Sequence, residues 1–139
     1  MIVVDASAVL AILFREASAG ALTARLAADP DRVISVASYI EAGTVLAGRR
    51  REDRLKAIDD LDSFLQEAGI EIAPIDATQA RIALAARIRF GRGMGHGGLI
   101  NFGDCFSYAL AIALAAPLLF TGNDFTTTDV KSALRAASP

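Results

Sequence analysis

The segment NFGDCFSYALAIALAAPLLFTGNDF, residues 101–125, predicts a helix, a strand and a turn in succession. Asp104 stands at the start of the helix, which is apolar on nearly every face and is broken by Pro117, because proline removes a backbone donor and clashes with the preceding turn. Leu118 to Phe120 form a short apolar run typical of a buried strand, and a turn containing Asp124 follows. In α/β proteins, acids placed in this way lie at the same edge of the sheet. We therefore expect Asp104 and Asp124 to belong to one site.

The composition favours a single domain with a core buried on more than one side. The chain has 139 residues, a size at which one domain buries a substantial core. Its hydrophobic content of 53% also favours a homodimer interface. With 14 basic and 16 acidic residues the net charge is -2, so the chain lacks the strongly basic balance of a dedicated nucleic-acid binder. We expect one domain over residues 1–139.

The sequence favours a cytoplasmic protein. A single cysteine, Cys105, excludes an intramolecular disulfide and fits a reducing compartment. We interpret it as a buried helix residue rather than a nucleophile, because the only histidine, His96, lies across a loop and is assigned no catalytic role. No Lys or Arg precedes the apolar stretch after Asp5, unlike in a signal peptide. The longest apolar run, residues 108–120, is too short to span a bilayer, so we expect no membrane association.

Strands alternate with helices along the chain. We expect strands at residues 2–4, 33–36, 70–75 and 118–120, helices over residues 7–14, 18–28, 38–48, 49–69, 76–90 and 104–116, and a short strand or helix within 126–139. Helical spacing predicts that the following residues face inward: Leu55, Ile58, Leu61, Leu65, Ala80, Ala83, Leu84 and Ile88. This order predicts an α/β fold with a central, mainly parallel sheet of four to five short strands flanked by helices.

Four acidic residues are placed where the carboxyl ends of parallel strands would meet. Asp5 follows the first strand, Glu41 lies in the helix after the second, Asp104 begins the helix that leads to the last strand, and Asp124 follows that strand. Each also has a purely structural interpretation. Asp5 and Asp104 are favoured helix N-caps, Glu41 completes a capping box that begins at Ser38, and Asp124 suits a turn.

Carboxylates that converge without a cation repel one another, and one or more would have to hold a proton. Mg²⁺ or Mn²⁺ removes this repulsion, because both ions prefer hard oxygen ligands. Such an ion can activate water and stabilise charge on a phosphate. A pocket made of carboxylates therefore indicates phosphate-ester chemistry.

Basic residues would have to hold an RNA backbone, since an acidic pocket does not attract it. The alternative for each of them is a solvated helix face. Two groups of arginines are available: Arg49, Arg50, Arg51 and Arg54, and Arg87, Arg89 and Arg92. The glycine-rich loop from Gly91 to Gly103 lacks the Lys-Ser/Thr ending of a phosphate-binding loop, and we interpret it as a mobile segment beside the site.

Four segments together resemble the PIN-domain family, and in particular its VapC-type toxins. They are VVDASAVLAIL at 3–13, S-x-x-E at 38–41, NFGDCFSYALA at 101–111 and LLFTGNDFTTTDV at 118–130. The resemblance implies an endoribonuclease toxin that depends on Mg²⁺ or Mn²⁺, forms a homodimer and is neutralised by a cognate antitoxin. It implies that Asp5 and Asp104 bind the metal directly and that Glu41 orients a water or completes the shell. Many relatives have Asp where this chain has Asn123, and Asp124 is the acid that this turn offers as the fourth catalytic residue.

Other functional classes are compatible with the length and fold class. A receiver-type signalling domain needs paired acids after the first strand, but Asp5 has Val4 and Ala6 as neighbours. A haloacid-dehalogenase-like phosphatase needs a second Asp where this chain has Ser7. A catalytically silent PIN-like module that binds RNA or protein remains the alternative, because of Asn123.

Overall fold

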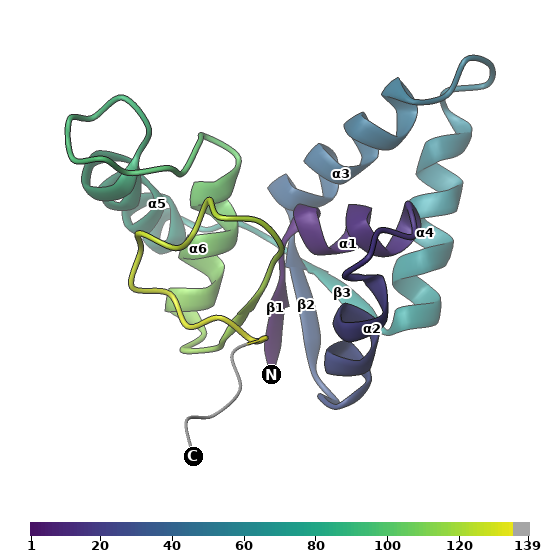
Figure 1. The fold of residues 1–139 in the computed structure, drawn as a ribbon, viewed down its shortest axis with the longest axis horizontal. Helices are drawn as coiled ribbons and strands as arrows, with labels where there is room; N and C mark the ends of the chain where they lie inside the picture. The colour runs from purple at the N-terminus through teal and green to yellow at the C-terminus, as the bar shows by residue number, and fades with distance from the viewer. Residues whose placement is uncertain (135–139) are drawn as a thin grey trace.

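Four short parallel strands form the centre of the part of the protein that the computed structural model describes, residues 1–134. The elements in chain order are β1 (Ile2–Val4), α1 (Ala6–Leu13), α2 (Ala19–Ala27), β2 (Arg32–Ser35), α3 (Val36–Gly48), α4 (Lys56–Ala68), β3 (Ile70–Ala73), α5 (Ala77–Phe90), α6 (Asp104–Ala113) and β4 (Leu118–Leu119). Figure 1 shows the strands in the middle, with α1 to α4 on one side and α5 and α6 on the other. The α/β class and the predicted parallel sheet are confirmed.

The strand order is β3-β2-β1-β4, and all pairs are parallel. Val3 of β1 is in register with Val33 of β2 and with Leu118 of β4. Because every strand points the same way, the segments that follow them start at one edge of the sheet. Figure 1 shows α1 and α3 beginning at the ends of β1 and β2.

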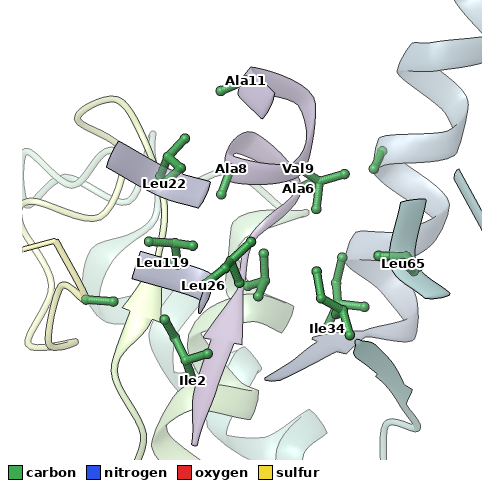
Figure 2. Packing of buried hydrophobic residues seen from close by; sticks show 14 of the residues in the cluster. Ile2, Ala6, Ala8, Val9, Ala11, Leu22, Leu26, Ile34, Leu65 and Leu119 are labelled. Carbon is green, nitrogen blue, oxygen red and sulfur yellow. The ribbon is translucent and has the colours of Figure 1, made fainter. Parts of the chain in front are cut away.

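Alternation along the strands divides the core into two halves, because successive side chains of a strand point to opposite faces. Ile2 and Val4 pack with side chains of α1 to α4, and Figure 2 shows this cluster around Ile34 and Leu119. Val3 points to the other face and packs with α5 and α6. Both faces are therefore covered, which explains why β1 and β4 are apolar without interruption, whereas the edge strand β3 carries the exposed Glu71.

The helix predicted over residues 49–69 begins later, at Lys56. The preceding residues form turns, and Asp53 has a left-handed φ of 51°. Leu61 and Leu65 are buried as predicted, but Leu55 is 78% exposed and Ile58 is 49% exposed. The prediction was wrong for these two residues because the first turn of α4 borders an open apolar groove against α3 instead of the core.

The inward face of α5 is also rotated from the prediction. Of the expected residues only Ala83 is buried, and it shares this face with Ala86 and Gln79. Ala80, Leu84 and Ile88 are exposed. The alanines at the contact are small and let α5 approach α6 closely. Helical spacing alone favoured the more apolar face of α5, which carries Leu84 and Ile88, as the buried one. Asp76, at the start of the helix predicted over residues 76–90, is the N-cap of α5 and accepts a hydrogen bond from the backbone of Gln79.

The end of the described chain adds one contact to the sheet. Ser132 makes a single parallel bridge to Leu118 of β4, and residues 126–134 contain no helix. The remainder of the predicted terminal strand or helix, residues 135–139, lies outside the described part. None of the helices within residues 1–134 has the length and apolar character needed to cross a membrane.

Candidate active site

A cavity of about 160 Å³ opens at the edge of the sheet where the strands end. All four acids singled out from the sequence contribute to its wall. The lining residues are Asp5, Ala6, Ser7, Leu10, Glu41, Asn101, Asp104, Thr121, Asp124 and Phe125. They come from segments that follow β1, β2 and β4, and from the segment at the start of α6. The predicted meeting of these acids at one edge is therefore found in the structure.

Asp5 is the most deeply placed of the four, with 2% of its surface exposed. It caps α1, and its Oδ2 accepts a hydrogen bond of 3.0 Å from the backbone of Ser7. Its Oδ1 accepts a hydrogen bond of 2.5 Å from the hydroxyl of Ser107 on α6. The capping role and the place in the cavity coexist, so the structural interpretation of Asp5 does not exclude a functional one.

Asp104 is 5% exposed and is the first residue of α6. The N-cap of this helix is Gly103, so the alternative interpretation of Asp104 as a helix cap does not hold. Asp104 and Asn101 hold each other instead. The backbone N–H of Asn101 donates to Oδ2 of Asp104, and the backbone N–H of Asp104 donates to the side-chain Oδ1 of Asn101, both at 2.9 Å. This reciprocal pair fixes the carboxylate at the cavity wall.

Glu41 lies within α3 and is not part of a capping box. The cap of α3 is Ser35, whose hydroxyl accepts from the backbone of Ala37. The predicted cap, Ser38, is buried inside the first turn. The helix starts earlier than predicted because β2 passes into α3 without a loop. Glu41 is therefore free of the structural role that sequence reasoning offered for it.

The carboxylate of Glu41 rests against the backbone of Gly103. A Cβ built at Gly103 would lie 2.9 Å from Oε2 of Glu41 and 3.1 Å from its Cδ. No side chain fits there unless Glu41 moves. Gly103 thus lets the acid on α3 approach the first turn of α6, which carries Asp104.

Asp124 lies in the turn after β4 and lines the cavity, whereas its neighbour Asn123 is exposed and is not among the lining residues. The turn is made by Gly122, whose φ of 87° favours glycine. Arg92, from the glycine-rich loop, approaches Asp124 with 3.9 Å between Nη2 and Oδ1. The loop therefore brings a positive charge to the mouth of an acidic cavity.

The carboxylates affect one another's protonation. Burial, followed by the charges of Asp5, Asp124 and Glu41, raises the pKa of Asp104 from 3.8 to about 7, against the opposing effect of the hydrogen bond from the Asn101 backbone amide. Burial, followed by the charges of Asp5 and Asp124, also raises the pKa of Glu41. The cavity without a cation is thus electrostatically unfavourable for its own acids.

The oxygen atoms that line the cavity fit a hard divalent cation. They are the carboxylates, the side-chain amide oxygen of Asn101 and the hydroxyls of Ser7 and Thr121. Among residues 1–134, however, no three Asp, Glu, His or Cys side chains are already arranged to hold one ion. Glu41 and Asp124 are less buried than Asp5 and Asp104, so they are the side chains that can rotate toward an ion.

Several residues at the cavity were not identified from the sequence as part of a site. Ser7 was interpreted only as a helix start, yet its hydroxyl accepts from the backbone of Thr121 at 3.2 Å and ties α1 to the turn after β4. Asn101 was not assigned a role, although its spacing of three residues from Asp104 is a recognisable capping pattern. Ser107 gave no signal, because a serine within an apolar helix is compatible with many positions.

Most of the arginines proposed as RNA contacts already have partners. The guanidinium of Arg49 lies over the ring of Phe14, and Arg50 pairs with Asp60. Arg87 donates to the backbone of Ile100 at 2.9 Å, and Arg89 lies over the ring of Phe90. Of the two groups, Arg92 is the member that contacts an acid of the cavity.

The chain matches the PIN domain family over residues 2–131. It therefore belongs to the PIN domain family, in agreement with its parallel sheet and acidic cavity. It is 47% identical to ribonuclease VapC28 of Mycobacterium tuberculosis over 132 residues, which cover 95% of this chain and 97% of that protein.

Solved structures share the fold at low sequence identity. Mycobacterium tuberculosis VapC20, a sarcin-ricin loop cleaving toxin, matches with a TM-score of 0.71 and 18% identity over 94% of this chain and 96% of that one. A toxin–antitoxin complex from Klebsiella pneumoniae contains a chain that matches with a TM-score of 0.67 and 16% identity, over 93% of each chain. The resemblance to the VapC group is confirmed.

Gly103→Ala tests the contact between Glu41 and α6. The φ of -64° at Gly103 suits alanine, so we expect stability within about 1 kcal/mol of the wild type. The new methyl group should displace the Glu41 carboxylate and weaken Mn²⁺ binding, measured by calorimetry. Gly48→Ala is the matched control, because its added Cβ meets no atom within 4 Å. Equal Mn²⁺ affinity in the two variants would contradict the role of this contact.

The raised pKa of Asp104 predicts a pH dependence of stability in the presence of a chelator. Between pH 3.8 and about pH 7 the folded protein retains a proton that the unfolded chain has released, so the free energy of unfolding falls as pH rises. Asp104→Asn removes this dependence. We expect Asp104→Asn, measured by urea unfolding, to gain stability relative to the wild type as pH rises across that window.

Gly48→Ala serves as the control for this titration, because it removes no ionisable group and its added Cβ meets no atom within 4 Å. Its stability difference from the wild type should stay nearly constant with pH. A constant difference for Asp104→Asn as well would show that Asp104 is not held in its protonated form.

Proposed function

We propose that the protein is an endoribonuclease that hydrolyses phosphodiester bonds of RNA and acts as the toxin of a toxin–antitoxin pair. The observation that carries this proposal is the convergence of Asp5, Glu41, Asp104 and Asp124 on one cavity at the carboxyl edge of the sheet. The 47% identity to ribonuclease VapC28 over nearly the whole chain supports the same activity. An RNA-cleaving toxin would act in the cytoplasm, where cellular RNA is found.

In this proposal Asp5 and Asp104 hold a Mg²⁺ or Mn²⁺ ion. Their carboxylates are the two that hydrogen bonds already fix in place, through Ser7 and Ser107 for Asp5 and through Asn101 for Asp104. Glu41 completes the shell or orients a water, and Asp124 is the fourth acid. The ion, when bound, supplies a nucleophilic water at neutral pH and stabilises charge on the phosphate.

The chain's own groups prepare the cavity for a cation. The proton that Asp104 retains near neutral pH is the one that a divalent cation would displace, because a positive charge among the acids favours their ionised forms. Glu41 and Asp124 line the same cavity and are less buried than Asp5 and Asp104, so they are the more accessible acids to an entering substrate phosphate. Phe125 and Leu10 contribute apolar wall that limits the entry of bulk water.

Arg92 is the best placed residue to contact the RNA backbone. Its side chain is 67% exposed and stands beside Asp124 at the mouth of the cavity. Once a cation offsets the charge of Asp124, the guanidinium is available to a phosphate, which it can bind through two parallel hydrogen bonds. Gly91, which precedes Arg92, is buried and packed against the backbone of Arg87, whereas Gly93, which follows it, has a φ of 86° and open space around its Cβ position.

A partner protein is supported by the apolar surface beside the cavity. Ile40 on α3 is 61% exposed and Phe102 before α6 is 69% exposed, and both line a hollow that also includes Glu41. The similarity to a chain of the Klebsiella pneumoniae toxin–antitoxin complex supports an antitoxin as one partner. The homodimer stays a proposal, and light scattering of the purified protein tests it by giving the mass of either one or two chains.

Induced expression in a bacterial host tests the nuclease proposal. The wild type should arrest growth and produce new RNA ends, whereas Asp5→Asn and Asp104→Asn should do neither. With purified protein we expect each substitution to lower the cleavage rate by a factor of about 100 or more, since even the outer partners of metal ligands are worth 10–100-fold. A chelator should abolish cleavage, and Arg92→Gln should raise KM for RNA more than it lowers kcat.

Asp59→Asn is the matched control, because Asp59 is an exposed acid in the first turn of α4 and does not line the cavity. It should arrest growth like the wild type. Full activity of Asp5→Asn or Asp104→Asn would refute the assignment of the site. If the wild type were soluble and harmless and cleaved no RNA with Mg²⁺ or Mn²⁺, a silent PIN-like binding module would be the better interpretation.

A further inference from the structure

Two buried serines lie beneath the acidic cavity and form a chain of hydrogen bonds to Asp5. Ser38 on α3 and Ser107 on α6 are both 0% exposed. Their hydroxyl oxygens are 2.7 Å apart, and the Ser107 hydroxyl is 2.5 Å from Oδ1 of Asp5. This series of hydrogen bonds thus connects α3, α6 and the junction between β1 and α1.

The direction of these hydrogen bonds follows from the chemistry of the groups. A carboxylate only accepts, so the single hydrogen of Ser107 is donated to Asp5. In the hydrogen bond between the two serines, Ser38 must therefore be the donor and Ser107 the acceptor. Because the other oxygen of Asp5 accepts from the Ser7 backbone, both oxygens of this carboxylate have a fixed donor. The orientation of Asp5 is therefore set by groups from three different elements.

The positions of the serines connect them to the other two acids. Ser38 precedes Glu41 by three residues on α3, and Ser107 follows Asp104 by three residues on α6. Residues three apart in a helix lie on the same face, one turn from each other. The hydrogen bond between the serines therefore joins the helix faces that carry Glu41 and Asp104, one turn away from the cavity.

Stability alone does not account for this pair. Burying a hydroxyl costs free energy that its hydrogen bond only approximately offsets. Alanine has a higher helix propensity than serine and nearly the same volume, and both helices use alanine at other buried positions, such as Ala42 and Ala109. Two alanines would fill this space without polar groups, but they would leave Oδ1 of Asp5 without its hydroxyl donor.

We propose that Ser38 and Ser107 are positioning residues, which orient the Asp5 carboxylate and hold it in register with Glu41 and Asp104 so that the three acids can bind one divalent cation. This inference rests on the proposed metal-dependent function. Ser107 acts on Asp5 directly, and Ser38 acts only through Ser107. The cation is identified by the chemistry of its ligands, hard carboxylate oxygens, and Mn²⁺ is the probe.

The test is a double-mutant cycle on Mn²⁺ binding, measured by calorimetry on the full chain. We expect Ser107→Ala to weaken Mn²⁺ affinity by about 10–100-fold, as outer partners of metal ligands do. Ser38→Ala should weaken it less. The double variant should match Ser107→Ala, because Ser38 has no route to Asp5 once the Ser107 hydroxyl is absent. At saturating Mn²⁺, Ser107→Ala should lower kcat for RNA cleavage while KM for RNA stays unchanged.

Thermal unfolding separates this role from a structural one. The double variant should be at least as stable as Ser107→Ala, because it removes the buried Ser38 hydroxyl that the single variant leaves without its acceptor. Stability and Mn²⁺ affinity should therefore not change in parallel. Ala109→Gly, at another buried position of α6, is the control: it should lower stability and leave Mn²⁺ affinity unchanged.

Mn²⁺ affinity of Ser107→Ala within twofold of the wild type would overturn the inference and leave the proposed function intact. If the losses of Mn²⁺ affinity from the two substitutions were additive in the double variant, Ser38 would not act through Ser107, and that part of the inference would be overturned. An equal loss of affinity in Ala109→Gly would show that the effect follows stability rather than position. Failure of the wild type to bind Mn²⁺ would overturn the metal assignment, and this inference with it.

Discussion

The mutual repulsion of carboxylates at the end of a parallel sheet is the constraint on which the rest of this structure depends. Asp5 and Asp104 are almost fully buried, and Glu41 and Asp124 share their cavity. Such an arrangement costs free energy in the absence of a cation, because burial first, and then the charges of the other three acids, raise the pKa of Asp104. A fold selected only for stability would not gather these acids. Their placement is understandable if the cavity binds positive charge during its function.

The surrounding structure holds the two buried acids, Asp5 and Asp104, in place with neutral donors rather than with salt bridges. Asp5 accepts from Ser7 and Ser107, and Asp104 accepts from the amide of Asn101. Neutral donors stabilise a carboxylate without cancelling its charge, so the field of the cavity remains available to an ion or substrate. The one arginine that contacts the group among the described residues, Arg92, does so at the exposed mouth and from a loop.

The sequence predicted the elements that depend on uninterrupted patterns, such as the apolar strand β1 and the helix capped by Asp76. It also predicted that Asp5 and Asp104 would meet, because parallel strands bring their ends to one edge. It failed where tertiary contacts decide. Ser38 was taken for a cap because the local pattern fits one, yet β2 continues into α3 and places this serine in the core beside Ser107. The contact of Gly103 with Glu41 joins residues far apart in the chain, and no local pattern records it.

We propose that the four acids form one cation site. The most direct test is a crystal structure of the protein soaked in MnCl₂, with anomalous diffraction recorded at an energy at which manganese scatters strongly. We expect a single strong anomalous peak inside the cavity, bound by carboxylate oxygens of Asp5 and Asp104, with Glu41 or Asp124 turned toward it. An empty cavity at Mn²⁺ concentrations that support RNA cleavage, or a peak bound elsewhere on the protein, would contradict it.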